Sequence, residues 1–164
     1  MATRIGGPNR REGLTGRGGA KDRHEAKTKA DPVDIAAFLN AVDPQARQDA
    51  ARALVALFGD ATGFEPRVWG GGIVGFGRYA YRFGSGRSGE TLATGFSPRK
   101  ADLSIYLPAG FAERQALLAE LGKHRVGKAC LYLRHLSDAD PVVLRQLIIA
   151  GVADLATRWT VLPE

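Results

Sequence analysis

The residues most able to do chemistry in this sequence are arginines, lysines and tyrosines in and around short alternating segments. Guanidinium and ammonium groups bind carboxylates and phosphates, and a tyrosine ring offers a flat apolar surface with a polar tip. Together they are typical of a site for an anionic or aromatic ligand. The candidate ligand-binding residues are Arg78, Arg82, Ser97, Arg99, Lys100, Tyr106, Lys123, His124, Lys128, Tyr132 and Arg134.

Alternation of apolar and polar residues predicts which side chains share a face of a sheet, because successive side chains of a strand point to opposite faces. The side chains predicted to pack against helices are Leu92, Thr94, Phe96, Leu103, Ile105, Leu131 and Leu133. Those predicted to face away are Arg78, Arg82, Ala93, Gly95, Ser104, Tyr106, Cys130, Tyr132 and Arg134. Adjoining loops add charge through Arg87, Arg99, Lys100, Lys123, Arg125 and Lys128. Such a face either binds an anionic ligand or is a solvated surface where arginine stems cover tyrosine rings.

The elements that must position these residues follow from periodicity and from chain breakers. Predicted helices span residues 31–41, 43–58, 111–121 and 140–155, and predicted strands span 73–74, 79–83, 91–97, 103–107 and 130–134. Asp-Pro pairs predict helix starts at Asp31, Asp43 and Asp140, and Gly59 predicts a helix end. Strands joined by tight turns are antiparallel neighbours. The fold class is therefore α+β: two layers, an antiparallel sheet of about five strands, and helices on one face.

Three glycine patterns resemble phosphate-binding motifs but lack the necessary context. Residues 122–128 fit the start of a P-loop, yet Ala129 replaces the hydroxyl residue that holds magnesium. This segment also runs from a helix into a strand, so no helix N-terminus faces the phosphates. Residues 75–80 and 84–89 fit dinucleotide patterns, but neither opens a helix. These glycines are better explained by bulges and tight turns of a twisted sheet.

No catalytic constellation is visible, so the sequence does not predict an enzyme. His124 and His135 flank one predicted strand and are expected to lie too far apart to share a metal ion. His135 has aspartates nearby, but Asp140 is better explained as a helix cap. The single cysteine, Cys130, is expected to be a small buried hydrophobe, with reaction as a nucleophile as the alternative.

Charge is uneven along the chain. Of the formal net charge of +6, the first 31 residues carry eight Lys or Arg against four Asp or Glu. Residues 1–30 are predicted to be a disordered, basic, glycine-rich tail that binds polyanions non-specifically or only solvates the protein. Residues 31–164 are predicted to form a single domain. No apolar stretch suits a signal peptide or a membrane span, so we expect a cytoplasmic protein that does not contact membranes.

Four segments resemble the bacterial YdhG-like domain of unknown function. They read GFGRYAY at 75–81, SGRSG at 85–89, GFSPRK at 95–100 and GKHRVGKACLYL at 122–133. The resemblance covers residues 69–149 and implies a compact α+β domain, usually intracellular. Some members are described as frataxin-like iron chaperones, which hold iron through surface carboxylates. The acids on the first predicted helices are Asp31, Asp34, Asp43 and Asp49.

Two functions of a binding domain follow as hypotheses, and an enzyme that uses Cys130 or His124 is a hypothesis of a different class. One is a small binding domain, iron-handling by resemblance, with iron as its only implied cofactor. The alternative is binding of an anionic ligand or nucleic acid through the basic aromatic face and the basic tail. The sequence does not identify a protein partner or an oligomeric state.

Overall fold

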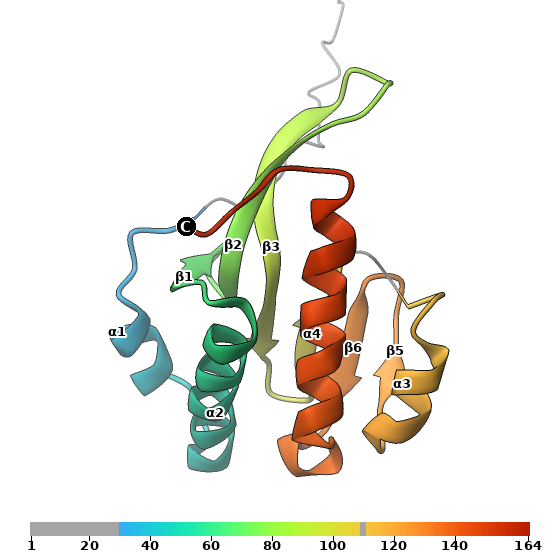
Figure 1. The fold of residues 1–164 in the computed structure, drawn as a ribbon. Coiled ribbons are helices and arrows are strands. Elements are labelled where there is room, and N and C mark those ends of the chain that lie inside the picture. Colours follow the sequence, from blue (N-terminus) through green and yellow to red (C-terminus); the bar gives the residue numbers. More distant parts are fainter. Residues whose placement is uncertain (1–29, 109–110) are drawn as a thin grey trace, which may run out of the picture.

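The computed structural model describes residues 30–108 and 111–164, which contain one antiparallel sheet of seven strands (Figure 1). The strands are β1 (Pro66–Trp69), β2 (Ile73–Arg82), β3 (Ser88–Pro98), β4 (Leu103–Tyr106), β5 (Arg125–Val126), β6 (Cys130–Leu133) and β7 (Val161–Leu162). Their order in the sheet is β1-β2-β3-β4-β6-β5, and β7 pairs with β2 beside this path. The predicted α+β class is confirmed, with a larger sheet than expected.

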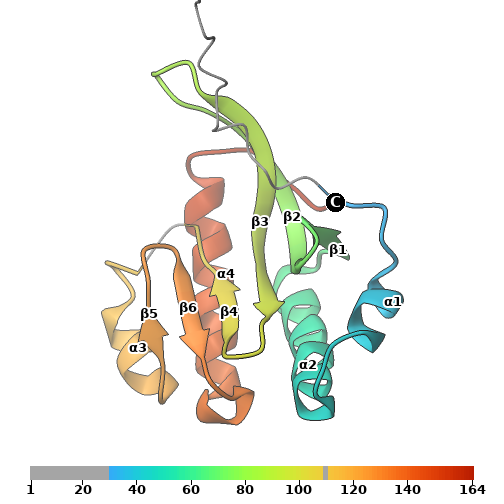
Figure 2. The same cartoon turned by 180° about the vertical axis from the view of Figure 1, so that it is seen from behind.

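Helices cover one face of the sheet. They are α1 (Ile35–Asn40), α2 (Gln45–Thr62), α3 (Gln115–Leu121) and α4 (Pro141–Ala156), with a short 3-10 helix η1 (Leu136–Asp138) before α4. Figure 1 views the molecule from the side on which α2 and α4 lie in front of the strands. Seen from behind, the strands lie in front of these two helices (Figure 2). The predicted two-layer arrangement is confirmed.

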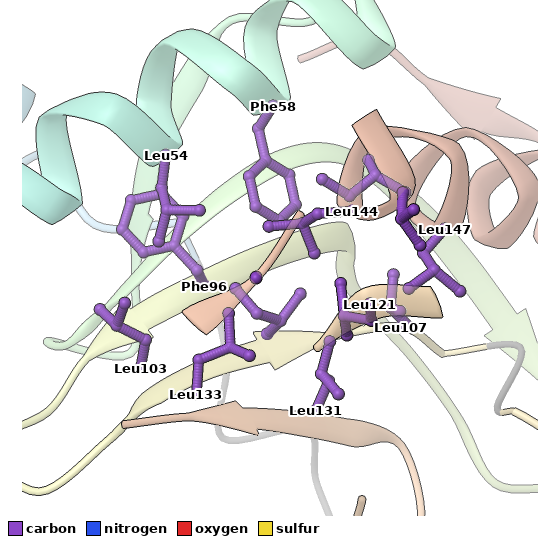
Figure 3. Close-up of a cluster of buried hydrophobic side chains, with 14 of the residues drawn as sticks. Leu54, Phe58, Phe96, Leu103, Leu107, Leu121, Leu131, Leu133, Leu144 and Leu147 are labelled. Carbon is purple, nitrogen blue, oxygen red and sulfur yellow. The ribbon is translucent and has the colours of Figure 1, made fainter. Parts of the chain in front are cut away.

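The core lies between α2, α4 and the middle of the sheet (Figure 3). From α2, Leu54 and Phe58 are completely buried, and the ring centroids of Phe58 and Phe96 lie 5.6 Å apart. Six of the strand residues predicted to pack against helices are 0% exposed: Thr94, Phe96, Leu103, Ile105, Leu131 and Leu133. Burial of apolar surface is the main favourable term in folding, so this layer fixes which face of β4 and β6 is turned outward.

The strand count differs from the prediction in two ways: glycine does not end β2, which joins two predicted strands, and three unpredicted strands enlarge the sheet. The two strands predicted over 73–74 and 79–83 are one strand, whose pairing with β3 runs from Val74 to Arg82. Gly77 adopts φ +70° within it, a conformation that favours glycine. The strands β1, β5 and β7 were not predicted, since they have only two to four residues and no clear alternation.

The boundaries of α1 and α2 also differ from the prediction. Helix α1 is capped by Asp34, whose carboxylate accepts a hydrogen bond from the backbone N–H of Ala37 at 3.2 Å. Asp31 instead accepts a bond from the turn between β1 and β2. Helix α2 runs through Gly59 and ends before Gly63, which has φ +71° and serves as the left-handed C-cap.

The start of α3 differs from the prediction, whereas the start of α4 agrees with it. Helix α3 begins at Gln115, four residues after the predicted start, and no side chain caps it. Helix α4 begins where the sequence predicts, because Asp140 accepts hydrogen bonds from the backbone N–H groups of Val142 and Val143. The prediction that Asp140 caps this helix is confirmed.

The reverse face of the sheet is covered near β1, contrary to the prediction of an open face. Trp69 and Leu92 are 2% and 6% exposed and lie against Gly75, where an added Cβ would come within 2.5 Å of the indole. Leu92 therefore lies on the reverse face rather than on the predicted inner face. Ala93 and Ser104, predicted to face outward, are also buried. The kink at Gly77 breaks the simple alternation that the prediction assumed.

The hairpin of β2 and β3 extends beyond the helices as an arm (Figure 1). Tyr79 and Tyr81 of β2 and Phe83, which follows β2, form a ring cluster with Trp159, which follows α4. Burial, and secondarily the neighbouring Tyr81, raises the pKa of Tyr79. The cluster packs the C-terminal segment, including β7, onto the arm.

Two further predictions concern the chain as a whole. Within the described residues, no helix has the length and hydropathy needed to cross a membrane. The predicted disordered tail over residues 1–30 lies outside the described residues except for Ala30, so its structure and polyanion binding stay predictions.

We predict that Leu133→Ala lowers the free energy of unfolding by about 2–5 kcal/mol, because it leaves a cavity in the core layer. Val126→Ala on the neighbouring β5 is the matched control: Val126 is 44% exposed, and its truncation should change stability by less than about 0.5 kcal/mol. Urea denaturation followed by tryptophan fluorescence measures both. Equal losses in the two variants would contradict the assigned inner face.

Candidate anion-binding site

A basic pocket lies at the end of the sheet where β6 finishes and β5 begins. Figure 2 shows these two strand ends toward its lower edge. It is an open hollow of about 630 Å³. Its lining residues, which define the basic pocket, are Arg47, Lys100, Ala101, Asp102, Lys123, His124, Arg125, Tyr132, Arg134, His135 and Asp138. Five lysines or arginines and two histidines therefore face only two carboxylates.

Separate segments of the chain meet in this pocket. The turn between β3 and β4 supplies residues 100–102, and the first turn of α2 supplies Arg47. The hairpin of β5 and β6 supplies Arg125 and Tyr132, and the segments that flank it supply the remainder. The hairpin is held by pairing of Arg125 with Tyr132 and of Val126 with Leu131. The backbone N–H of Gly127 donates to the carbonyl of Cys130 at 2.7 Å and closes the hairpin. Sheet pairing thus gathers residues that are distant in sequence.

Gly122 fixes the approach of the chain to the pocket. It has φ +109°, and a Cβ there would lie 2.0 Å from the carbonyl oxygen of Asp138. Gly122 forms an isolated β-bridge with Ala139, and the N–H of Asp140 donates to the carbonyl of Leu121 at 2.7 Å. Only glycine permits this approach, which brings the segment before β5 next to η1.

Two of the arginines are held by neighbours. A terminal nitrogen of Arg125 lies 3.1 Å from Asp102 Oδ2, and its guanidinium carbon lies 4.9 Å from the centroid of the Tyr132 ring. A terminal nitrogen of Arg47 donates to the carbonyl of Arg134 at 3.1 Å. The contacts of Arg125 hold its guanidinium over the Tyr132 ring, an arrangement that electrostatic attraction to the ring stabilises.

The other cations of the pocket have no such partner. Across residues 30–108 and 111–164, the side chains of Lys100, Lys123 and Arg134 take part in no ion pair. All three are exposed at the rim of the basic pocket. Clustered charges of one sign raise the local concentration of counter-ions. The pocket is therefore suited to an anion.

The placement of the histidines corrects the sequence-based expectation. His124 and His135 were expected to be far apart, yet both line the basic pocket. The error came from the unpredicted strand β5, because the hairpin brings the residue before β5 beside the residues after β6. One ring nitrogen of His124, Nδ1, lies 2.7 Å from the carbonyl oxygen of Gly122. In the part of the chain that the structure describes, no three His, Cys, Asp or Glu side chains are grouped to hold a metal ion.

Next to the pocket, the outward residues of β4 and β6 form a second group. Its members Tyr106 and Cys130 are directly opposite each other, as are Ser104 and Tyr132. Tyr106 raises the pKa of the neighbouring Arg99, mainly through a hydrogen bond and secondly through charge. Partial burial raises the pKa of the Cys130 thiol, and this outweighs the lowering by Tyr132 and Arg99.

The sequence-predicted ligand residues fall into three sets. The structure brings five of them together in the basic pocket: Lys100, Lys123, His124, Tyr132 and Arg134. Arg99 and Tyr106 belong to the adjoining group just described. The remaining four lie elsewhere: Arg78, Arg82, Ser97 and Lys128.

These four residues lie away from the basic pocket, and Lys128 among them is exposed in the turn between β5 and β6. Arg78 pairs with Glu90 at 2.7 Å on the arm, and Arg82 is exposed further along β2. Ser97 is 4% exposed and its hydroxyl donates to the carbonyl of Gly72 at 2.6 Å. Because that hydroxyl is already bonded in the fold, we leave Ser97 out of the site.

The sequence-based list omitted some pocket residues. Arg47 lies on a helix whose pattern shows only which residues are apolar, so no sequence signal connected it to β6. Asp102 is a single acid in the turn between β3 and β4, and Asp138 is the last residue of η1. The alternating pattern of β6 and the basic run over residues 122–128 were the signals that did locate the pocket.

Comparisons with protein-family models, with curated proteins and with solved structures give no match to the chain. The YdhG-like resemblance therefore stays a prediction.

We predict that Cys130 reacts slowly with iodoacetamide at neutral pH, because a raised pKa leaves less thiolate. The alkylation rate should rise with pH, with a midpoint above that of a cysteine peptide. Arg99→Ala should move the midpoint higher still, since it removes a positive charge that favours the thiolate. Mass spectrometry follows the reaction at this single cysteine. A midpoint below that of the peptide would contradict the assignment.

Proposed function

We propose that this domain binds a small phosphate-bearing ligand in the basic pocket. The observation that supports this most directly is the convergence of Lys100, Lys123 and Arg134 on one hollow without ion-pair partners among the described residues. Phosphate oxygens accept charge-assisted hydrogen bonds from such groups, which are about twice as strong as neutral ones. The ligand would replace the counter-ions that this cluster attracts.

The pocket also suits a small ligand in size and shape. A hollow of about 630 Å³ lies within the usual range for small-molecule sites, roughly 300–1,000 Å³. Its cations come from a turn, from the loop before β5 and from the end of β6. Anchoring at three points orients a ligand as well as attracting it, so the geometry favours a specific small anion over a diffuse polyanion.

Iron handling, which the family resemblance implies, receives less support. Iron bound through carboxylates needs several oxygen ligands close together. The predicted acids Asp31 and Asp34 have structural roles, in the β1–β2 turn and at the start of α1. We therefore rank anion binding above iron binding.

Catalysis by Cys130 receives no more support than iron handling. A thiol whose pKa is raised is a poor nucleophile at neutral pH. We therefore propose a binding domain rather than an enzyme, and a cytoplasmic location stays a prediction.

We predict that isothermal titration calorimetry detects binding of inorganic pyrophosphate to the full chain, weakening as salt rises. A Lys123→Ala, Arg134→Ala double variant should bind at least about tenfold more weakly, since each lost charge-assisted bond is worth about 1.5–3 kcal/mol. Its stability to urea should be close to that of the unaltered protein, because both side chains are exposed.

Lys128→Ala is the matched control for charge. Lys128 is an exposed cation of the turn between β5 and β6 that does not line the basic pocket, so this variant should bind pyrophosphate within about twofold of the unaltered chain. An equal loss of binding in the control and the double variant would contradict a specific site. Absence of binding by the unaltered protein would contradict the proposal itself.

A further inference from the structure

We propose that the ligand of the basic pocket is a nucleotide, whose base stacks on Arg125 above Tyr132 while its phosphate contacts the surrounding cations. This inference rests on the proposed function and specifies its ligand class. The observation behind it is the Arg125 guanidinium, held 4.9 Å from the centroid of the Tyr132 ring inside the same hollow as Lys100 and Lys123.

The guanidinium is placed to stack on a second planar group. Its inner side is directed to Tyr132, and Asp102 holds its edge at 3.1 Å. The Arg125 side chain nevertheless remains 70% exposed, so solvent reaches its outer side. Guanidinium planes and aromatic rings are the surfaces on which unstacked bases are recognised. A base would therefore extend an existing stack rather than create one.

The Tyr132 ring beneath it is held in position. A Cβ on Gly127 would lie 3.0 Å from Tyr132 Cε2 and 3.3 Å from its hydroxyl oxygen, so the glycine lets the ring pack against the hairpin backbone. Tyr132 is also fixed by strand pairing to Ser104 on one side and Arg125 on the other. A platform that is already ordered loses little conformational entropy when a ligand binds.

The two halves of the pocket match the two halves of a nucleotide. Exposed cations without ion-pair partners in the described residues suit a phosphate, and the arginine–tyrosine stack suits a flat heterocycle. An inorganic phosphate or a sugar phosphate would use only the first half. The open hollow of about 630 Å³ contains both features, so a nucleotide would use both halves.

The test compares ligands that differ only in the base. Isothermal titration calorimetry is run on the full chain with adenosine and guanosine monophosphates, ribose 5-phosphate and inorganic phosphate. Stacking of a base is worth about 1–3 kcal/mol, so at least one nucleotide should bind about 5-fold to 100-fold more tightly than ribose 5-phosphate. The variants Tyr132→Leu and Arg125→Lys should each remove most of this difference.

Two features keep these variants interpretable. Arg125→Lys alters an exposed side chain, so it reports on the stack even if Tyr132→Leu fails to fold. Its ammonium keeps the positive charge but lacks the plane, so ribose 5-phosphate should bind as before. Phe83→Leu is the control for losing an aromatic ring, because Phe83 is 49% exposed on the arm and does not line the pocket. It should leave every affinity unchanged.

The outcomes separate this inference from the proposed function. Equal binding of both nucleotides and ribose 5-phosphate would overturn the inference and leave anion binding intact. Binding of none of these compounds would overturn both. A 5′-phosphorylated dinucleotide identifies the source: tighter binding than the mononucleotide indicates the end of a strand, and equal or weaker binding indicates a free nucleotide.

Discussion

Burial of one side of β4 and β6 beneath α2 and α4 is the constraint on which the remaining structure depends. Leu103, Ile105, Leu131 and Leu133 are all inaccessible to solvent, and a slip of one residue in either strand would expose its apolar set. The core therefore fixes the register of both strands. With the register fixed, Tyr132 has no position open to it other than the outer face, between Ser104 and Arg125. The apolar packing thus orients a polar site that it does not contact.

The basic pocket places like charges close together, an arrangement that the fold supports from several directions. The hairpin of β5 and β6, the turn before β4 and the first turn of α2 each bring cations to one end of the sheet. Mutual repulsion of exposed charges is modest in water, because solvent and salt screen it. Asp102 offsets part of it by pairing with Arg125. What remains is a positive hollow with a ring in its wall, which is the basis of the proposed ligand class.

Sequence reasoning succeeded where burial follows a simple period and failed where short contacts decide the geometry. Alternation over residues 103–107 and 130–134 correctly predicted the inner face, and Asp140 marked the start of α4. Strand β5 has two exposed residues and no period to detect, so the proximity of His124 and His135 was missed. The alternation expected for β3 breaks near Gly77, which has a positive φ, so Leu92 lies on the reverse face, and Trp69 covers that face at Gly75. About half of the predicted ligand residues lie in the basic pocket. These lie near β6, whose register the apolar pattern predicted correctly.

The central claim is that an anion binds where β5, β6 and the β3–β4 turn meet. A titration of isotopically labelled protein with pyrophosphate, followed by ¹H–¹⁵N correlation spectra, tests this claim most directly. Saturable shifts concentrated at the backbone amides of residues 100–102, 123–125 and 134–135 would agree with it. Shifts centred on the arm over residues 78–90, or no shifts at any ligand concentration, would contradict it.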